Sequence, residues 1–496
     1  MKRLIIFVHR YLGIPMSVVF VVWFVSGIVM MYTGGMPALG GSERLRGLGA
    51  VDLDAVLLSP AEAVARAGIE GRVSSATLAN LLGRPVYRFG RAFGGETSVF
   101  ADTGELFEGA TPAQAAAEVA RFLGQPPEAV RHAGTVTEPD QWTITEARSL
   151  PLERFDVDDG EGTRAYFSLG SGEVELVTDG GSRTLAWLGA IPHWFYFTPL
   201  RLNQPLWYWT VVWVSVAGCA LAVLGLALAV TQFRRSKPFR LSASIRYRGL
   251  MRWHYYTGAL FGVFALTWVF SGLLSVEPFD WTTASGMRLP RNDLEGGALE
   301  LERYEPGDPA FAAALGGEPP LEVSLMRIQT EPYYLVRSAV TTGGADEPVR
   351  RRIIDADTLA RRSEPFPAES ILAELEATVT EASIREHAVL DRYDAYYYAQ
   401  GGAAPLPVLR VKFDDPADTW YYFDLMTSGA VAANHRLGRL ERWLFNGLHS
   451  LDFGFWYDRR PLWDIGVILL SLGALATSGI GMYLGLKRLT RRQSSG

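Results

Sequence analysis

Four histidines carry the chemistry that this sequence suggests most directly. His9 and His254 each begin a long apolar stretch, and His193 and His449 each lie twelve residues before a proline that opens another. A neutral imidazole nitrogen binds haem iron well, and two histidines on facing helices can hold one haem between them. We therefore predict two b-type haems, one between His9 and His254 and one between His193 and His449.

The residues around these histidines recur as an internal repeat. His9 precedes Gly13, Trp23 and Ser26 by four, fourteen and seventeen residues, and His254 precedes the same residue types by the same distances. A glycine four residues after a ligand lies on the same helix face, where a flat macrocycle needs space. Ordinary small-residue packing between helices is the alternative explanation of these glycines. We call a set of residues that recurs in both halves at the same spacing a ladder, and the set that begins at His9 and His254 is the first. A second ladder pairs Arg183, Trp187, His193, Pro205, Leu206 and Trp207 with Arg439, Trp443, His449, Pro461, Leu462 and Trp463.

Arginines near both histidine pairs are candidate partners for haem propionates. Arg10 and Arg252 neighbour the first pair, and Arg183 and Arg439 precede the second. Cations that reach from a helix end toward lipid head groups are the alternative, because such residues are common there.

The other histidines and motifs give weaker signals. His132 and His387 match each other within the repeat, as a metal or iron-chelate site or as a duplicated core or turn position, and His435 receives no role. The single cysteine, Cys219, excludes an intrachain disulfide, covalently attached haem and an iron–sulfur cluster. Glycine-rich nucleotide loops and a His-Glu-x-x-His motif are absent from the sequence, so we expect no flavin, nicotinamide or nucleic-acid binding.

Four apolar stretches must position these histidines. Each is about 20 residues or longer, enough to cross a bilayer as a helix. They run over Leu12–Tyr32, Leu206–Val230, Thr257–Val276 and Leu462–Leu486.

The distribution of charge predicts the orientation in the membrane. Apart from Asp464, the 53 acidic residues lie in the two long segments between the spans. By the positive-inside rule, basic stretches without acidic residues are cytoplasmic. Both termini are then inside and both long segments outside, and the first span is a retained anchor rather than a cleaved signal peptide. The basic residues in question are Lys2, Arg3, Arg10, Arg234, Arg235, Lys237, Arg240, Arg246, Arg248, Arg252, Lys487, Arg488, Arg491 and Arg492.

These observations predict a helical membrane protein of four spans and two pseudo-symmetric repeats, with two outer α+β domains. Its parts are a first span (1–32), a first outer domain with an interfacial segment (33–205), a second span (206–232), a basic cytoplasmic loop (233–252), a third span (253–276), a second outer domain with an interfacial segment (277–461), a fourth span (462–486) and a cytoplasmic tail (487–496).

Local signals predict elements within the outer domains. Ser59 and Glu62 form a capping box that opens a helix over Ala61–Ala67, and Thr111 and Gln114 repeat it before Ala115–Leu123. The stretch between Glu295 and Pro320 reads as loop. Further predicted elements are strands Pro85–Phe89, Thr97–Phe100, Tyr333–Ser338, Arg352–Asp355, Leu409–Phe413 and Trp420–Asp424, and a helix Ala368–Ala377.

The ladder His9-Arg-Tyr-Leu-Gly13, followed by Trp23 and Ser26-Gly27, resembles the first helix of the PepSY-associated transmembrane family. The stretch Trp443–Gly454 resembles the last interfacial segment of that family, and Ser59–Glu105 is similar to a PepSY domain. Members include inner-membrane ferrisiderophore reductases that hold b-type haems between their helices. The resemblance implies this ligand role for His9, His254, His193 and His449, and PepSY-like folds for both outer domains.

The function that we expect is electron transfer across the bacterial inner membrane. An unidentified cytoplasmic or membrane donor would reduce the protein, which would in turn reduce a periplasmic ferric siderophore or a similar ferric chelate. The alternative is a non-redox receptor or protease-regulating module that is merely anchored by its helices. A transporter has less support, because the spans lack internal carboxylates and broken helices.

Overall fold

The structure of the protein is a computed structural model that describes residues 2–91, 95–237, 240, 244–282, 286–289, 298–339, 349–399 and 404–493. Some residues named above lie outside this description. They are 238–239 and 241–243 of the basic loop, 295–297, the tail residues 494–496, and the side chains of Arg491 and Arg492.

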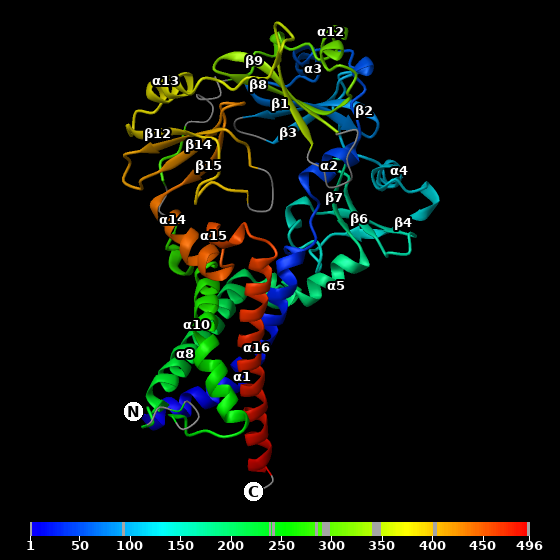
Figure 1. The fold of residues 1–496 in the computed structure, drawn as a ribbon. Coiled ribbons are helices and arrows are strands. Elements are labelled where there is room, and N and C mark those ends of the chain that lie inside the picture. Colours follow the sequence, from blue (N-terminus) through cyan, green and yellow to red (C-terminus); the bar gives the residue numbers. More distant parts are fainter. Residues whose placement is uncertain are drawn as a thin grey trace.

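Four long apolar helices form a bundle, at the places that the sequence predicts. α1 lies against α8 and α16, and α10 lies against the same two helices. The two chain ends lie at the end of the bundle that points away from the sheets (Figure 1). The length and apolar composition of the four helices imply contact with a lipid bilayer. The bounds are Lys2–Thr33 for α1, Gln204–Gln232 for α8, Leu250–Leu274 for α10 and Leu462–Gln493 for α16.

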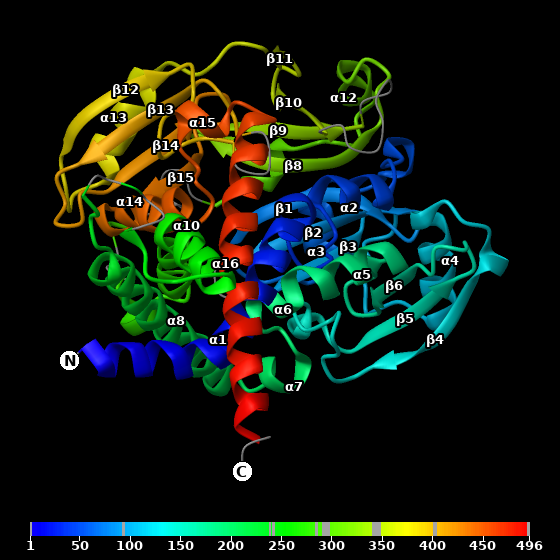
Figure 2. The same cartoon turned by 60° about the horizontal axis from the view of Figure 1, so that its bottom comes forward.

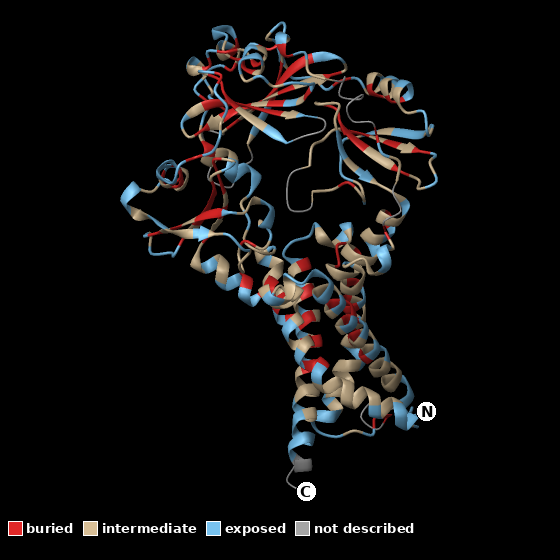
Figure 3. Ribbon diagram, turned by 180° about the vertical axis from the view of Figure 1, so that it is seen from behind, coloured by how far each residue is buried: buried red, intermediate tan, exposed pale blue. Residues whose placement is uncertain are grey.

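Small residues bring the four helices close together. A Cβ on Gly218 of α8 would lie only 2.9 Å from Val269 of α10. The bundle core is otherwise aromatic and apolar, with Phe20, Phe24 and Trp268 buried between the helices. Figure 3 shows that burial follows the inner faces of the helices and is densest in the sheets. Close backbone approach is how helices gain packing energy where lipid offers no hydrophobic contrast.

One seven-stranded sheet joins the two long segments of the chain. Its strand order is β11-β10-β9-β8-β1-β2-β3, and the antiparallel pair β1–β8 places Ala76 opposite Leu325. Residues of both segments therefore share one hydrophobic core beneath this sheet. The strands are β1 (Val73–Leu81), β2 (Arg84–Arg91), β3 (Glu96–Phe100), β8 (Pro320–Ile328), β9 (Glu331–Ser338), β10 (Arg350–Asp355) and β11 (Arg361–Arg362).

Each long segment adds an antiparallel four-stranded sheet of its own, in the order of the chain. Both sheets lie on the side of the seven-stranded sheet that faces the bundle (Figure 1). The first contains β4 (Val130–Val136), β5 (Leu152–Val157), β6 (Arg164–Ser168) and β7 (Glu173–Thr178), and the second β12 (Ile384–Leu390), β13 (Val408–Phe413), β14 (Trp420–Asp424) and β15 (Ala430–Asn434).

The predicted capping boxes are present in the structure. Ser59 caps α3 with Glu62, and Thr111 caps α4 with Gln114. The loop prediction for the residues before Pro320 is wrong, because α12 follows Asp308, whose carboxylate accepts from the Ala310 amide. An N-cap aspartate followed by proline is a helix-start signal. The helices of this region are α2 (Gly41–Leu48), α3 (Pro60–Arg66), α4 (Pro112–Leu123), α12 (Pro309–Ala314) and α13 (Ala368–Thr378).

Short helices connect the sheets to the bundle in both segments. α6 packs against α1 (Figure 2), and the π-helical turn η6 packs against α10. These connections place His193 and His449 beside the sheet-side ends of the spans. They are α5 (Gly180–Leu188), α6 (Ala190–Trp194), α7 (Thr198–Arg201), α14 (Arg436–Arg442), η6 (Trp443–Gly447) and α15 (Gly454–Tyr457).

Candidate functional site

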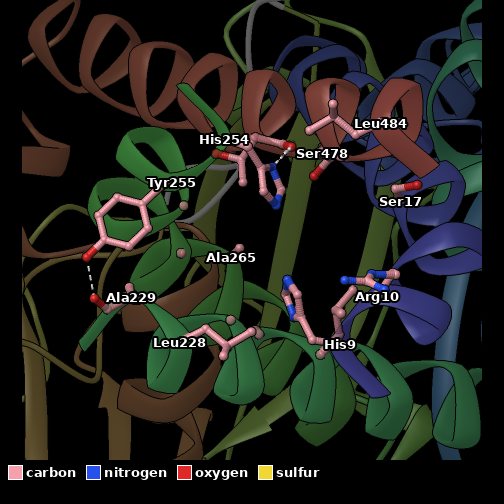
Figure 4. A pocket seen from close by; sticks show the side chains of 18 of the residues that line it. His9, Arg10, Ser17, Leu228, Ala229, His254, Tyr255, Ala265, Ser478 and Leu484 are labelled. Atoms are coloured by element: carbon pink, nitrogen blue, oxygen red, sulfur yellow. Dashed lines mark hydrogen bonds between the residues drawn. The ribbon is translucent and has the colours of Figure 1, made fainter. Parts of the chain in front are cut away.

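His9 of α1 and His254 of α10 lie opposite each other near the chain-end side of the bundle. Their ring centres are 6.4 Å apart, and the rings point toward each other across a cavity (Figure 4). Two metal–imidazole bonds of about 2 Å, plus about 1.1 Å from each nitrogen to its ring centre, place two such centres about 6 Å apart. The pair is therefore spaced as two axial ligands of one iron would be.

The cavity at this pair has a volume of about 760 Å³ and is lined by all four spans. This volume is in the range of pockets that enclose a drug-sized ligand or cofactor. Gly13 and Gly258, the glycines of the repeated ladder, line it as predicted. Two further glycines lie closer to the rings. A Cβ on Gly225 would come within 3.0 Å of Cε1 of His9, and one on Gly481 within 3.1 Å of Cε1 of His254.

Hydrogen bonding determines which nitrogen of His254 is available to a metal. Its Nδ1 lies 3.1 Å from the carbonyl oxygen of Thr477, which can only accept. Nδ1 therefore carries the proton, and Nε2 has the lone pair that ligation requires. Nδ1 of His9 is buried, and the His9 ring meets the backbone of Leu221.

Cations line the same cavity. Arg10 is among them, as predicted, and Lys487 and Arg488 of α16 join it. Arg252 instead donates to the carbonyl oxygen of Tyr247. From the sequence alone, Lys487 and Arg488 are expected only to set the orientation in the membrane, because the sequence does not show which helix faces which.

His193 of α6 and His449, which follows η6, form a second pair at the sheet-side end of the bundle. Their ring centres are 6.2 Å apart, with the ring planes at 78°. Burial lowers the pKa of His193 to about 3, with a smaller contribution from the neighbouring His449, whose own pKa burial also lowers. Both imidazoles are thus neutral at physiological pH, the form that binds a metal.

Matching serines hold the two rings of this second pair. Ser26 Oγ and Ser271 Oγ each lie 3.0 Å from Nδ1 of their histidine, His193 and His449 respectively. Each serine gives its proton to a carbonyl of its own helix, for example Ser26 to that of Val22 at 2.7 Å. The serine oxygen must then accept from Nδ1–H, which leaves Nε2 unprotonated on both rings.

Glycines repeat the correspondence, whereas the two tryptophans contact the second pair in different ways. A Cβ on Gly27 would lie 3.4 Å from His193 Cε1, and one on Gly272 would lie 3.5 Å from His449 Cε1. Trp23 Nε1 donates to the carbonyl oxygen of His193 at 3.1 Å. The Trp-x-x-Ser-Gly part of the ladder thus contacts the second histidine pair, although in sequence it follows the first.

The arginines predicted for the second pair are engaged elsewhere. Arg183 donates to Thr178 and Gly162, and Arg439 forms an ion pair with Asp418. Arg201, which the sequence reading missed, lies over the rings of Tyr196 and Trp207. Its Nε and Nη1 are buried without hydrogen-bond partners among the described residues.

The remaining histidines lie away from both pairs. His132 and His387 occupy β4 and β12, the edge strands of the two four-stranded sheets, rather than core or turn positions. Both side chains are exposed, and that of His132 contacts Glu153 at 2.5 Å. His435 accepts from the Gly438 amide and caps α14. Within the described residues, no three His, Cys, Asp or Glu side chains gather as a metal-ion site.

The residues present fit a haem at each pair. Each pair offers two imidazoles at the spacing of axial ligands, and at least three of the four present Nε2. A macrocycle would supply the other four nitrogens, so no third protein ligand is required. A glycine lies against each of the four rings and makes room for the imidazole, and the cavity described at the first pair offers space for a flat group.

This combination defines a multi-pass membrane protein with a sheet-rich region at one end of a four-helix bundle and two histidine pairs inside it. The chain belongs to the family described as the PepSY-associated TM region, whose model matches residues 7–488. No curated protein sequence matches the chain.

Proposed function

We propose that the protein is a b-type dihaem electron-transfer protein of the bacterial inner membrane. His9 and His254 would hold one haem, and His193 and His449 the other. A haem with two histidine ligands exchanges one electron at its iron. The observation that carries this proposal is the opposed spacing of both pairs, together with hydrogen bonds that keep Nε2 unprotonated.

The protein's own residues prepare the two sites. Ser26, Ser271 and the Thr477 carbonyl orient the imidazoles, and the glycines make room for the rings. Arg10, Lys487 and Arg488 offer positive charge to propionates at the first site. Arg201 is the candidate at the second, because its unpartnered nitrogens need acceptors.

We further propose that the chain has two pseudo-symmetric repeats, cytoplasmic termini and periplasmic sheets. Matched contacts such as Ser26–His193 and Ser271–His449 support the repeat. The basic residues near the chain ends, opposite the sheets, support the orientation. The electron acceptor would be a periplasmic ferric siderophore or a similar ferric chelate, and the donor would act from the cytoplasm or the membrane.

Single substitutions test the ligand assignment. His193→Ala or His449→Ala should remove one haem per chain, and His9→Ala or His254→Ala should remove the other, measured as pyridine haemochrome on purified protein. His387→Ala, an exposed histidine, is the control that keeps both. Full haem content in all four variants would contradict the assignment, and protein that never contains haem would favour the receptor function.

A further inference from the structure

The end of the bundle that carries both chain termini is strongly basic. The stretches that reach this end, 1–42, 204–276 and 465–496, contain no aspartate or glutamate. Uncompensated charges of one sign create a potential that attracts partners of the opposite sign. Six basic side chains on the described part of the basic loop between α8 and α10 are exposed, namely Arg234, Arg235, Lys237, Arg240, Arg246 and Arg248.

The cavity at the first histidine pair opens at this same end. Lys487 and Arg488 of α16 line the cavity and are also exposed. Tyr247 of the basic loop forms another part of its wall. A partner that rests on the basic loop therefore lies beside the opening of the cavity into which His9 and His254 point (Figure 4).

Hydrogen bonds give the described part of the basic loop a fixed shape. The Arg234 amide donates to the Ser244 carbonyl at 3.0 Å, and the Arg240 amide donates to Ser236 Oγ at 2.7 Å. Ser244 and Ile245 are 0% and 4% exposed, so the loop is packed against the protein. Positive charges that set topology act through their number near a span and require no fixed geometry. The order of the loop therefore indicates a further role.

Contacts with α10 hold the basic loop at the cavity wall. Arg252 Nε donates to the Tyr247 carbonyl at 2.8 Å. The ring centre of Tyr247 also lies 5.9 Å from that of Tyr255. Because Tyr247 lines the cavity, the loop and the cavity wall form one continuous surface.

The fold of the loop brings like charges together. The bond between Arg234 and Ser244 joins the two ends of the loop, so Arg234 and Arg235 lie near Arg246 and Arg248. Clustered charges of one sign repel each other, and an anionic partner removes this repulsion. The arrangement therefore favours a negatively charged surface as its partner.

An acidic protein suits this surface better than anionic lipid head groups do. Polybasic segments bind anionic lipids through the number of their charges. The basic loop instead fixes the positions of its charges, beside the opening of a cavity that leads to His9 and His254. Encounters between redox proteins bury little area and depend on complementary charge for their rate and orientation.

We propose that the surface formed by Arg234, Arg235, Arg246 and Arg248 docks an acidic, water-soluble one-electron carrier protein. This inference rests on the proposed function, for which it names the class of electron donor. One electron leaves the reduced carrier and reduces one ferric ion at the first histidine pair to the ferrous state. No proton and no chemical group is transferred with it.

Binding of oxidised carriers tests the surface without any electron transfer. The probes are two acidic carriers, an oxidised plant-type [2Fe–2S] ferredoxin and an oxidised flavodoxin. Each is titrated calorimetrically into the full-length protein in nanodiscs of zwitterionic phosphatidylcholine, so that no anionic lipid competes. Wild type should bind one equivalent of at least one probe at low ionic strength, and the affinity should fall steeply as salt is added.

Paired substitutions locate the binding surface. Arg234→Gln with Arg235→Gln should weaken binding at least about tenfold, while the other basic residues of the loop keep the topology signal. Arg72→Gln with Arg91→Gln removes two exposed charges from the sheet region and is the matched control, expected to bind as wild type does. Circular dichroism melting shows whether each variant is folded.

Equal binding by wild type and the folded R234Q/R235Q variant would overturn the proposal. So would the absence of binding of either probe to wild-type protein with full haem content. If R234Q/R235Q loses only bound phosphatidylglycerol, in nanodiscs that contain this lipid, the surface is a lipid site and the proposal fails. Haem-free wild-type protein that still binds a carrier through Arg234 and Arg235 would instead overturn the proposed function and leave this docking surface intact.

Discussion

His193 and His449 are 256 positions apart in the chain, yet each is held through Nδ1 by a serine, with the two serine contacts at the same distance of 3.0 Å. Those serines belong to spans that begin with His9 and His254. The ladder that starts at one histidine pair therefore ends at the other. Each of α1 and α10 thus contributes a ligand candidate to the first pair and a supporting serine to the second.

The glycines beside the first pair are predicted to be essential for the position of the imidazole rings. Gly481→Val would bring side-chain atoms against His254, because even a Cβ would lie 3.1 Å from Cε1. We expect loss of about one haem per chain, measured as pyridine haemochrome, since a methyl-sized intrusion into a packed site is strongly unfavourable. Gly479→Val is the control on the same helix, where a Cβ meets nothing within 4 Å. Equal haem loss in both variants would show a general packing defect.

The serines are predicted to tune the second site without being required for it. Ser26→Ala removes the acceptor of the His193 Nδ1–H and so makes this imidazole a weaker electron donor to a bound metal, whereas in Ser271→Ala the Trp268 carbonyl, 3.2 Å from His449 Nδ1, remains as an acceptor. In Ser26→Ala the midpoint potential of one haem should rise by on the order of 30–60 mV, the upper value being a tenfold effect for one electron. Spectroelectrochemical titration measures it. Ser275→Ala, whose hydroxyl bonds its own helix at Gly272 and no other described residue, should leave both potentials unchanged.

The buried ion-pair network of the first long segment is predicted to stabilise the sheet region. Glu173 is 1% exposed and pairs with Arg88 and Arg44. Glu173→Gln leaves the buried Arg88 guanidinium without its nearest counter-charge, which should cost about 3–5 kcal/mol of unfolding free energy. Thermal unfolding followed by tryptophan fluorescence would show a lower transition. Glu96→Gln, an exposed partner of Arg88 at 3.9 Å, should change stability by less than about 1 kcal/mol.

The orientation is tested by cysteine labelling in intact cells. In a Cys219→Ser background, Glu161→Cys introduces an exposed thiol in the first long segment, and Lys237→Cys introduces one in the basic loop. A membrane-impermeant maleimide should label position 161 at once and position 237 only after the inner membrane is opened. The reverse pattern would contradict a periplasmic location of the sheets.

Much of this arrangement could be predicted from the sequence because the informative signals are local or repeated. The four spans follow from apolar length, and the caps at Ser59 and Thr111 follow from residues three positions apart. The pairing of His9 with His254 and of His193 with His449 follows from the repeated ladders. Asp308-Pro309 carries a local helix-start signal as well, although the loop-like composition around it predicts no helix.

The rest depends on contacts between distant parts of the chain. Gly225 and Gly481 recur at the spacing of the second ladder, but only the structure shows that they lie against His9 and His254. The pairing of β1 with β8, which joins the two long segments in one sheet, leaves no mark on either strand alone. The engagement of Arg439 by Asp418 likewise requires the fold of the last sheet.

The central claim is tested most directly by a reduced-minus-oxidised visible spectrum of the detergent-purified protein, combined with a pyridine haemochrome count. Two opposed pairs of histidines, at least three of which present Nε2, predict low-spin b-type bands and about two haems per chain. Protein from haem-sufficient cells that is folded, colourless and free of haem would contradict the account.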